Sequence, residues 1–157
     1  MKKKSTTKGI GSVEVQLEVT VHAPQKRVWE ALVHETTHWW PKSFYTDPKT
    51  KKFVIEPRLG GRVFEDYGGG EGFTWYTVNG VESPNFLLLV GYMAPPFGGP
   101  SASLLRLGLS AVGANETKLE ITDAAFGQVA GCDSESGWRE IFHDNFRAYV
   151  ESGKKKK

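Results

Sequence analysis

Residues 134–151 read SESGWREIFHDNFRAYVE, and this stretch decides the fold that we expect. Its large side chains recur at the spacing i, i+3, i+4, i+7 and i+11 of one helix face: Trp138, Ile141, Phe142, Asn145 and Tyr149, with Phe146 and Val150 beside them. Asp133 or Ser134 can cap the start, and Gly153 follows the end. The sequence therefore predicts a long amphipathic C-terminal helix with an aromatic face.

The opposite end of the chain predicts a strand followed by short helices. Residues 13–21 alternate apolar with polar or charged side chains, which is the pattern of a half-buried strand. Pro24 then stands where the first turn of a helix tolerates proline, and apolar residues at helical spacing continue to His34. Residues 36–40 predict a second short turn, which Pro41 ends.

Six further strands lie between these two ends. We place them at residues 53–56, 62–67, 71–78, 86–92, 101–111 and 117–125. Short turns rich in Gly, Pro or Asn separate them, which favours an antiparallel meander. The prediction is an α+β fold: a curved antiparallel sheet of about seven strands wrapped on the C-terminal helix, with one or two short helices after the first strand.

Length and composition fit a single domain over residues 9–153. A chain of 157 residues with 39% hydrophobic and 24% charged residues is ordinary for a globular protein, and we find no internal repeat or interior linker. The aromatic share of 12% suggests a wide interior, a binding surface, or both.

The net charge of +2 conceals an acidic body. Eight lysines lie in two basic tails, residues 1–8 and 154–157, which we expect to be flexible. Without them, 12 basic residues face 18 acidic ones, a balance of about −6. Sequence-specific nucleic-acid binding needs a basic face on the fold itself, so we expect none.

The remaining bulk features favour a cytoplasmic protein. Cys132 is the single cysteine, which excludes an internal disulfide. No apolar run approaches the roughly 20 residues of a membrane span, and no secretory signal is present. We expect no cofactor and no metal, and leave a monomer and a homodimer both open.

One motif invites a different interpretation. His34-Glu35-Thr36-Thr37-His38 matches the H-E-x-x-H signature of zinc proteases, which needs both histidines on one helical face and a third protein ligand. Here the match falls at a predicted helix end, immediately before Trp39-Trp40-Pro41, and no histidine lies between His38 and His143. We interpret it as a chance match and do not expect a zinc protease.

Three groups of residues carry a resemblance to a known family. They are Ala23-Pro24 with Val28-Trp29, Ala31-Leu32 and Trp39-Trp40-Pro41; Glu56-Pro57-Arg58 with Gly60-Gly61-Arg62 and Phe64-Glu65; and Gly137-Trp138 leading through Phe142, Phe146 and Tyr149 to Glu151-Ser152-Gly153. In this order and spacing the chain resembles the START-like (SRPBCC, helix-grip) superfamily over residues 13–153. Within it, the chain resembles the branch of homologues of the activator of the ninety-kilodalton heat-shock protein ATPase.

The resemblance implies a helix-grip fold with a cavity between the sheet and the last helix. Relatives bind lipids, hormones or polyketides, and some catalyse cyclisation or hydration, but the branch has no shared catalytic set to carry over. Relatives often read Thr-His-x-Gly-Phe in the last strand, whereas this chain reads Thr122-Asp123-Ala124-Ala125-Phe126-Gly127. Whatever role that histidine has does not transfer here.

Three functions remain open. The first is a carrier or sensor that binds a small hydrophobic molecule in the cavity. The second is an enzyme of the cyclase or hydratase kind, with Glu65 or Asp123 as acid or base. The third is a co-chaperone or adaptor, which the family name alone suggests and which needs an exposed apolar patch.

The candidate ligand-binding residues are of two kinds. The aromatic candidates, which otherwise belong to the plain core, are Trp40, Phe44, Trp75, Tyr92, Phe97, Trp138 and Phe142. The charged candidates are Glu65, Arg106 and Asp123, which lie within predicted strands and either face solvent or turn inward. A charge that turns inward must be paired or must meet a polar group of the ligand.

The loop of residues 94–100 is a candidate lid. It reads APPFGGP, so prolines stiffen its ends, Gly98-Gly99 permits a hinge, and Phe97 is its one large apolar side chain. We predict that Phe97 folds over the cavity and closes on a bound ligand. The alternative is a hairpin loop with Phe97 anchored in fixed core.

Overall fold

Seven strands form one antiparallel sheet in the computed structural model of the chain, which describes residues 9–153. The strands are β1 (Gly11–Val21), β2 (Lys52–Ile55), β3 (Arg62–Gly68), β4 (Glu71–Glu82), β5 (Phe86–Met93), β6 (Ser101–Gly113) and β7 (Glu116–Gly127). Their order across the sheet is β1-β7-β6-β5-β4-β3-β2, so β1 pairs with the last strand and the others form a meander. The predicted sheet is confirmed. The predicted basic tails, residues 1–8 and 154–157, lie outside the described residues.

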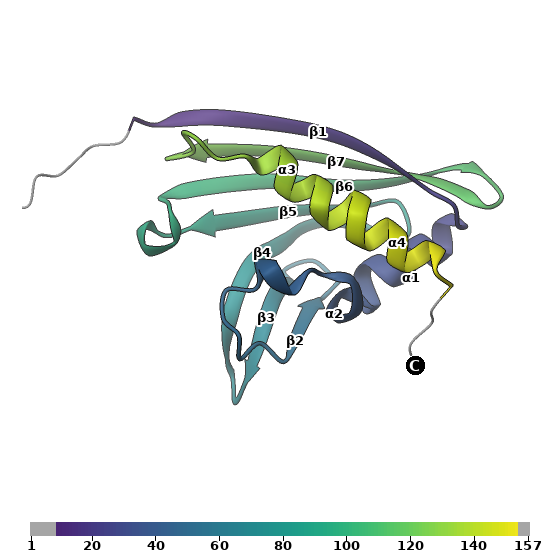
Figure 1. The fold of residues 1–157 in the computed structure, drawn as a ribbon, viewed down its shortest axis with the longest axis horizontal. Coiled ribbons are helices and arrows are strands. Elements are labelled where there is room, and N and C mark those ends of the chain that lie inside the picture. Colours follow the sequence, from purple (N-terminus) through teal and green to yellow (C-terminus); the bar gives the residue numbers. More distant parts are fainter. Residues whose placement is uncertain (1–8, 154–157) are drawn as a thin grey trace, which may run out of the picture.

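Helices fill the connection after β1 and the C-terminal end. The connection from β1 to β2 holds α1 (Gln25–His34), α2 (Thr36–Trp39) and η1 (Lys42–Phe44), and η2 (Pro95–Phe97) lies between β5 and β6. The C-terminal helix comprises α3 (Ser134–Trp138), η3 (Arg139–Phe146) and α4 (Arg147–Glu151), and it lies across one face of the sheet (Figure 1). This is the predicted helix-grip architecture. Among residues 9–153, no helix combines the length and apolarity needed to cross a bilayer.

Alternation along the strands gives the sheet an inner and an outer face. In β7, Leu119 and Ile121 are fully buried. Their neighbours Lys118 and Glu120 point to the opposite face and form an ion pair with each other. The inner face packs on the C-terminal helix, whose Phe142 and Phe146 are also buried. Burying each such side chain contributes about 2 kcal/mol, so the helix is held chiefly by its aromatic face.

Aromatic rings fill the space between the sheet and the middle of that helix. The Trp39 ring lies 4.7 Å from that of Phe146 and 5.9 Å from that of Phe142. It also contacts Trp40, whose ring stacks on Phe53 at 4.2 Å. The expected cavity is therefore closed by side chains beneath η3, and the open space lies toward α3.

The centre of the C-terminal helix differs from the prediction of a regular α-helix. Segment η3 is a π-helix, in which the Arg147 N–H donates to the Phe142 carbonyl five residues earlier. The Asn145 side-chain amide donates to the Glu140 carbonyl at 2.7 Å, again across five residues. A spacing of four between apolar residues does not distinguish the two helix types, because Trp138, Phe142 and Phe146 share a face in both.

The turn between β2 and β3 is built on one carboxylate. The Glu56 carboxylate accepts hydrogen bonds from Arg62 Nε at 3.1 Å, Arg62 Nη2 at 2.9 Å and the Arg62 N–H at 2.9 Å. A side chain on Gly61 would collide with the Glu56 carbonyl oxygen. Glu56 belongs to this turn, so β2 ends at Ile55, one residue before the predicted strand end.

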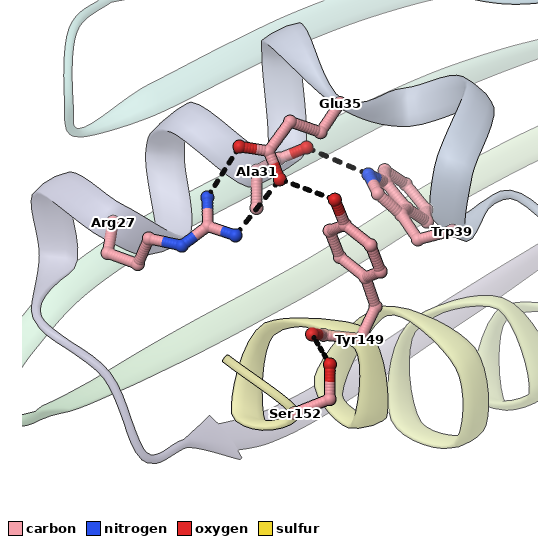
Figure 2. A network of polar contacts seen from close by, with 6 residues as sticks. All are labelled: Arg27, Ala31, Glu35, Trp39, Tyr149 and Ser152. Atoms are coloured by element: carbon pink, nitrogen blue, oxygen red, sulfur yellow. Dashed lines mark hydrogen bonds and ion pairs between the residues drawn. The ribbon is translucent and has the colours of Figure 1, made fainter. Parts of the chain in front are cut away.

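A polar cluster joins α1 to α4 (Figure 2). The Arg27 guanidinium donates to both oxygens of Glu35 at 2.7 and 2.9 Å, and the Tyr149 hydroxyl donates to Glu35 Oε2 at 2.7 Å. Burial raises the pKa of Glu35, but the hydrogen bonds from Arg27 and Tyr149 outweigh it and leave the pKa below its ordinary value. The cluster holds the end of the last helix against the first one.

Candidate functional site

A groove of about 410 Å³ opens between the inner face of the sheet and the first turns of the C-terminal helix. We call it the helix-end groove, and its lining residues are Phe44, Trp75, Met93, Asp123, Cys132, Asp133, Ser134, Gly137, Trp138 and Ile141. A smaller pocket of about 150 Å³ adjoins it, since the two share Trp75, Met93, Asp123, Cys132 and Ser134. Phe73 and Ser103 are among the further residues that line this smaller pocket.

A β-bulge turns Trp75 toward the groove. In the pairing of β3 with β4, Val63 lies opposite Tyr76 and Phe64 lies opposite Thr74, so Trp75 is one extra residue. Trp75 and Tyr76 thereby both lie on the inner side, which strict alternation along a strand would forbid. The Trp75 Nε1–H donates to Glu65 Oε1 at 2.8 Å, which fixes the indole ring.

Glu65 is a buried anchor beneath Trp75 and does not line the groove. Both of its oxygens are occupied, because the Thr46 N–H donates to Oε1 at 2.9 Å and to Oε2 at 3.1 Å. The Thr50 hydroxyl donates to Oε2 as well. With three donor groups on one fully buried carboxylate, Glu65 joins the segment after η1 to the sheet and positions Trp75.

Asp123 lines both the groove and the smaller pocket, and is 5% exposed. Its Oδ2 accepts from Trp138 Nε1 at 2.8 Å, and its Oδ1 accepts from Ser103 Oγ at 2.6 Å. Ser103 Oγ in turn lies 3.3 Å from the Tyr76 hydroxyl oxygen. Burial raises the pKa of Tyr76 well above its ordinary value, and the bond with Ser103 offsets only part of this. Tyr76 therefore stays protonated and can donate toward Ser103 and Asp123.

The structure brings part of the predicted set together. Phe44, Trp75, Asp123 and Trp138 line the helix-end groove, and Tyr92 borders the smaller pocket while its side chain is largely exposed. These groove residues come from η1, β4, β7 and α3, which are distant in sequence.

Other predicted residues lie elsewhere. Trp40 and Phe142 belong to the buried aromatic core, and the Trp40 Nε1 is buried without a hydrogen-bond partner among the described residues. Arg106 lies on the outer face, because its neighbours Leu105 and Leu107 point inward, and it pairs with Glu120 at 3.8 Å. Phe97 is 52% exposed, and its ring meets the edge of the Phe73 ring at 5.1 Å, beside the smaller pocket.

Sequence reasoning missed the other lining residues, which are Phe73, Gly91, Met93, Ser101, Ser103, Ala125, Val129, Cys132, Asp133, Ser134, Gly137 and Ile141. Successive side chains of a strand point to opposite faces of the sheet, and this rule predicts that Ser103 points inward, because it lies two residues before the inward-facing Leu105 on β6. The same alternation predicts an inward-facing Met93 on β5, because Met93 lies two residues after the buried Gly91 and four after the buried Leu89. The residues around Cys132 lie in a loop, for which no periodicity applies.

Gly137 keeps the groove open. A Cβ at this position would meet the Phe44 ring at 3.6 Å, an ordinary van der Waals contact, so packing does not require glycine there. Glycine inside a helix costs about 1 kcal/mol relative to alanine. A side chain longer than a methyl group would extend from α3 into the space facing Phe44.

The H-E-x-x-H residues do not form a metal centre. Helix α1 ends at His34 and α2 begins at Thr36, so the two histidines do not lie on one continuous helix. The Glu35 carboxylate is engaged by Arg27 and Tyr149 (Figure 2) and is not free to polarise a water molecule. Within residues 9–153, no group of three or more His, Cys, Asp or Glu side chains is placed to hold a metal ion.

Comparisons with solved structures show similarity over nearly the whole chain. An uncharacterized protein from Rhizobium leguminosarum has a TM-score of 0.68 at 18% identity, covering 92% of this chain and 97% of that chain. An AHSA1-like protein from Aeromonas hydrophila has a TM-score of 0.60 at 18% identity, covering 90% and 94%. No protein-family model and no curated protein sequence matches the chain.

A plant enzyme shares the same architecture. Norcoclaurine synthase from Thalictrum flavum, solved in complex with dopamine and hydroxybenzaldehyde, has a TM-score of 0.61 at 12% identity, covering 94% of this chain and 91% of that chain. At these identities the similarities establish the helix-grip fold and nothing further.

Proposed function

We propose that the chain binds a small molecule with an apolar body in the helix-end groove, as a carrier or sensor. The observation that carries this proposal is the groove itself: an unfilled space of about 410 Å³ with aromatic walls from three separate elements. Ligand sites are typically concave, mostly apolar and supplied with a few polar groups, and occupy roughly 300 to 1,000 Å³. Phe44, Trp75 and Trp138 supply the walls, and Asp123 supplies the main polar group.

Gly137 supports the same function independently. Its lack of a side chain weakens the helix and is not needed for packing, so its effect is to leave room opposite Phe44. Glycine also permits a ligand to approach the backbone closely. A protein without a ligand at this position would gain about 1 kcal/mol of helix stability from alanine.

We also propose membership in the branch of homologues of the activator of the ninety-kilodalton heat-shock protein ATPase. The structural likeness to the AHSA1-like protein supports it. So does the Glu56 to Arg62 motif, whose carboxylate, glycine and arginine all have defined roles in one turn.

An enzyme of the cyclase or hydratase kind is the second candidate, and Asp123 favours it. Asp123 combines burial, a place in the groove, and a chain of hydroxyl groups through Ser103 to Tyr76. Such a chain could pass a proton to or from a bound molecule. Glu65 does not fit this role, because its oxygens are occupied and it lies outside the groove. A substrate conversion that is lost in both Asp123→Asn and Ser103→Ala would support the enzyme over the carrier.

The adaptor function is supported only by exposed apolar residues on the sheet. Leu88, Leu104 and Phe126 are exposed large apolar residues of β5, β6 and β7. They lie on three neighbouring strands but do not define the chemistry of a partner. A direct binding measurement with a purified ninety-kilodalton chaperone tests this function, and absence of binding removes it.

A pair of variants at Gly137 tests the proposed function. Native mass spectrometry is applied to the protein as purified and after incubation with 2-(2-naphthyl)ethanol. We expect a bound small molecule in the wild type and in Gly137→Ala, and its loss in Gly137→Leu, whose side chain extends into the groove. Equal binding by the wild type and Gly137→Leu would contradict binding in this groove. Circular dichroism is used to check that both variants are folded.

A further inference from the structure

Two carboxylates are buried on the inner face of the sheet, and they differ in what surrounds them. Glu65 is fully buried, has both oxygens occupied by three donor groups, and lines no part of the groove. Asp123 accepts two hydrogen bonds from the described residues and lines both the groove and the smaller pocket. The hydrogen-bonding needs of the Glu65 carboxylate are therefore met within the protein, whereas the Asp123 carboxylate can accept further hydrogen bonds.

Asp123 lines the groove and has acceptor positions that no described residue fills. A carboxylate offers about four acceptor positions, of which Trp138 Nε1 and Ser103 Oγ use two. Both of these donors are neutral. A buried charge that meets only neutral donors remains costly unless an opposite charge accompanies it.

No cation from residues 9–153 accompanies Asp123. The described residues hold no ion pair with it, and the residues that line the groove and the smaller pocket include no Lys, Arg or His. The other carboxylate in the groove, Asp133, accepts from the Ser136 N–H at the start of α3 and adds negative charge. The formal net charge of residues 9–153 is about −6, which also favours a positively charged ligand.

The walls of the groove favour an organic cation over a metal ion. Trp75, Phe44 and Trp138 present aromatic rings, which attract an ammonium group electrostatically and bury an apolar body at the same time. A metal ion would need several oxygen, nitrogen or sulfur ligands, and no such group of three is assembled in the described part of the chain.

We propose that the helix-end groove takes a small organic amine, whose protonated nitrogen pairs with Asp123 while its apolar body lies against Trp75, Trp138 and Phe44. This inference rests on the proposed binding function and adds the chemical class of the ligand. The ammonium group supplies the charge that Asp123 lacks and fills its free acceptor positions. The same carboxylate disfavours an anionic ligand of the same shape.

Three compounds that share one apolar group and differ in charge test the ligand class separately from the ability of the groove to bind a ligand. They are 2-(2-naphthyl)ethylamine, 2-(2-naphthyl)ethanol and 3-(2-naphthyl)propanoate, which are cationic, neutral and anionic near pH 7. Equilibrium dialysis against the full chain gives their dissociation constants. We expect the amine to bind about tenfold or more tightly than the alcohol, and the propanoate to bind most weakly.

Two variants assign the preference to one carboxylate. Asp123→Asn retains an acceptor for Trp138 Nε1 but removes the charge, so we expect the amine and the alcohol to bind it equally. Asp133→Asn is the matched control, because asparagine caps a helix as well as aspartate does and the change removes the same charge from the same groove. We expect the preference for the amine to survive in Asp133→Asn.

The outcomes that overturn the inference are distinct. Equal binding of amine and alcohol to the wild type would overturn the amine class and leave the proposed function standing. Loss of the preference in Asp133→Asn as well as Asp123→Asn would assign it to the general negative potential of the groove and overturn the role of Asp123. Binding by none of the three compounds would contradict the groove as a ligand site and with it both proposals.

Discussion

The Trp138 indole Nε1 donates a 2.8 Å hydrogen bond to Oδ2 of Asp123 and thereby ties the first turns of the C-terminal helix to strand β7. Both residues line the helix-end groove, so this bond fixes one wall of the groove relative to its floor. Because Trp138 is also 7% exposed and packs on Phe142 at 5.8 Å, its ring has little freedom to move. The groove is thus preformed on rigid elements, which reduces the entropy that a ligand must lose on binding.

Glu65→Gln tests the role of Glu65 as a buried anchor. The amide would present an NH₂ group to at least one of the donors that Thr46, Thr50 and Trp75 direct at the carboxylate. We expect a loss of about 2 kcal/mol in the free energy of unfolding by urea denaturation.

Glu71→Gln is the matched control, since Glu71 is exposed at the start of β4, and we expect a change within about 0.5 kcal/mol. A Glu65→Gln protein as stable as this control would show that the buried carboxylate is not an anchor.

Much of the fold could be predicted because its determinants are local. The alternation through Leu119, Ile121 and Asp123 places β7 and turns Asp123 inward with its apolar neighbours. The aromatic face of residues 134–151 places the last helix across the sheet in the same way.

The groove was harder to predict, because non-local features create it. Trp75 reaches it only through a bulge, which depends on the pairing of β3 with β4. Gly137 appears in the sequence as an ordinary weak helix residue, and only the position of the Phe44 ring reveals the space that it leaves. For Arg106 and Phe142 the residue type wrongly suggested a place in the site. The strand register places Arg106 on the outer face, and Phe142 packs in the aromatic core.

Phe97→Ala tests the predicted lid. Phe97 is half-exposed and touches Phe73 at the edge of the smaller pocket, which fits a side chain that moves over a bound molecule. We expect release of 2-(2-naphthyl)ethylamine in stopped-flow measurements to become several-fold faster.

Val112→Ala, at an exposed apolar position of β6, is the control and should leave release unchanged. Unchanged release from Phe97→Ala together with a lowered melting temperature would instead identify Phe97 as an anchor.

The pH dependence of the β2 to β3 turn follows from Glu56. Hydrogen bonds from the side chain and backbone of Arg62 lower the pKa of Glu56 from 4.5 to about 2. Because the folded pKa lies below the unfolded one, the turn is stabilised above about pH 4.5, and this contribution is lost as the pH falls toward 2. Titration of the Glu56 carboxyl by NMR measures the pKa directly. It should rise toward 4.5 in Arg62→Met, and a value that stays near 2 would mean that Arg62 is not the cause.

Tyr149→Phe tests the cluster that joins the first and last helices. The change removes only the hydroxyl that donates to Glu35 Oε2 at 2.7 Å (Figure 2), so we expect a loss of about 1 kcal/mol in unfolding free energy. Tyr92→Phe offers a comparison, since Tyr92 is 75% exposed and its loss of a hydroxyl should change stability by less than about 0.5 kcal/mol. Equal effects of the two changes would show that the bond to Glu35 does not hold the helices together.

The location of the ligand is tested most directly by the indole N–H signals of the five tryptophans in ¹⁵N-labelled protein. Trp138 and Trp75 line the groove and donate to Asp123 and Glu65, whereas Trp29 is buried in α1 and lines no part of the groove. On titration with 2-(2-naphthyl)ethylamine, we predict saturable shifts of the Trp138 and Trp75 signals and a constant Trp29 signal. If dialysis shows binding of the amine while the Trp138 and Trp75 signals stay in place, the molecule binds elsewhere and the helix-end groove is not its site.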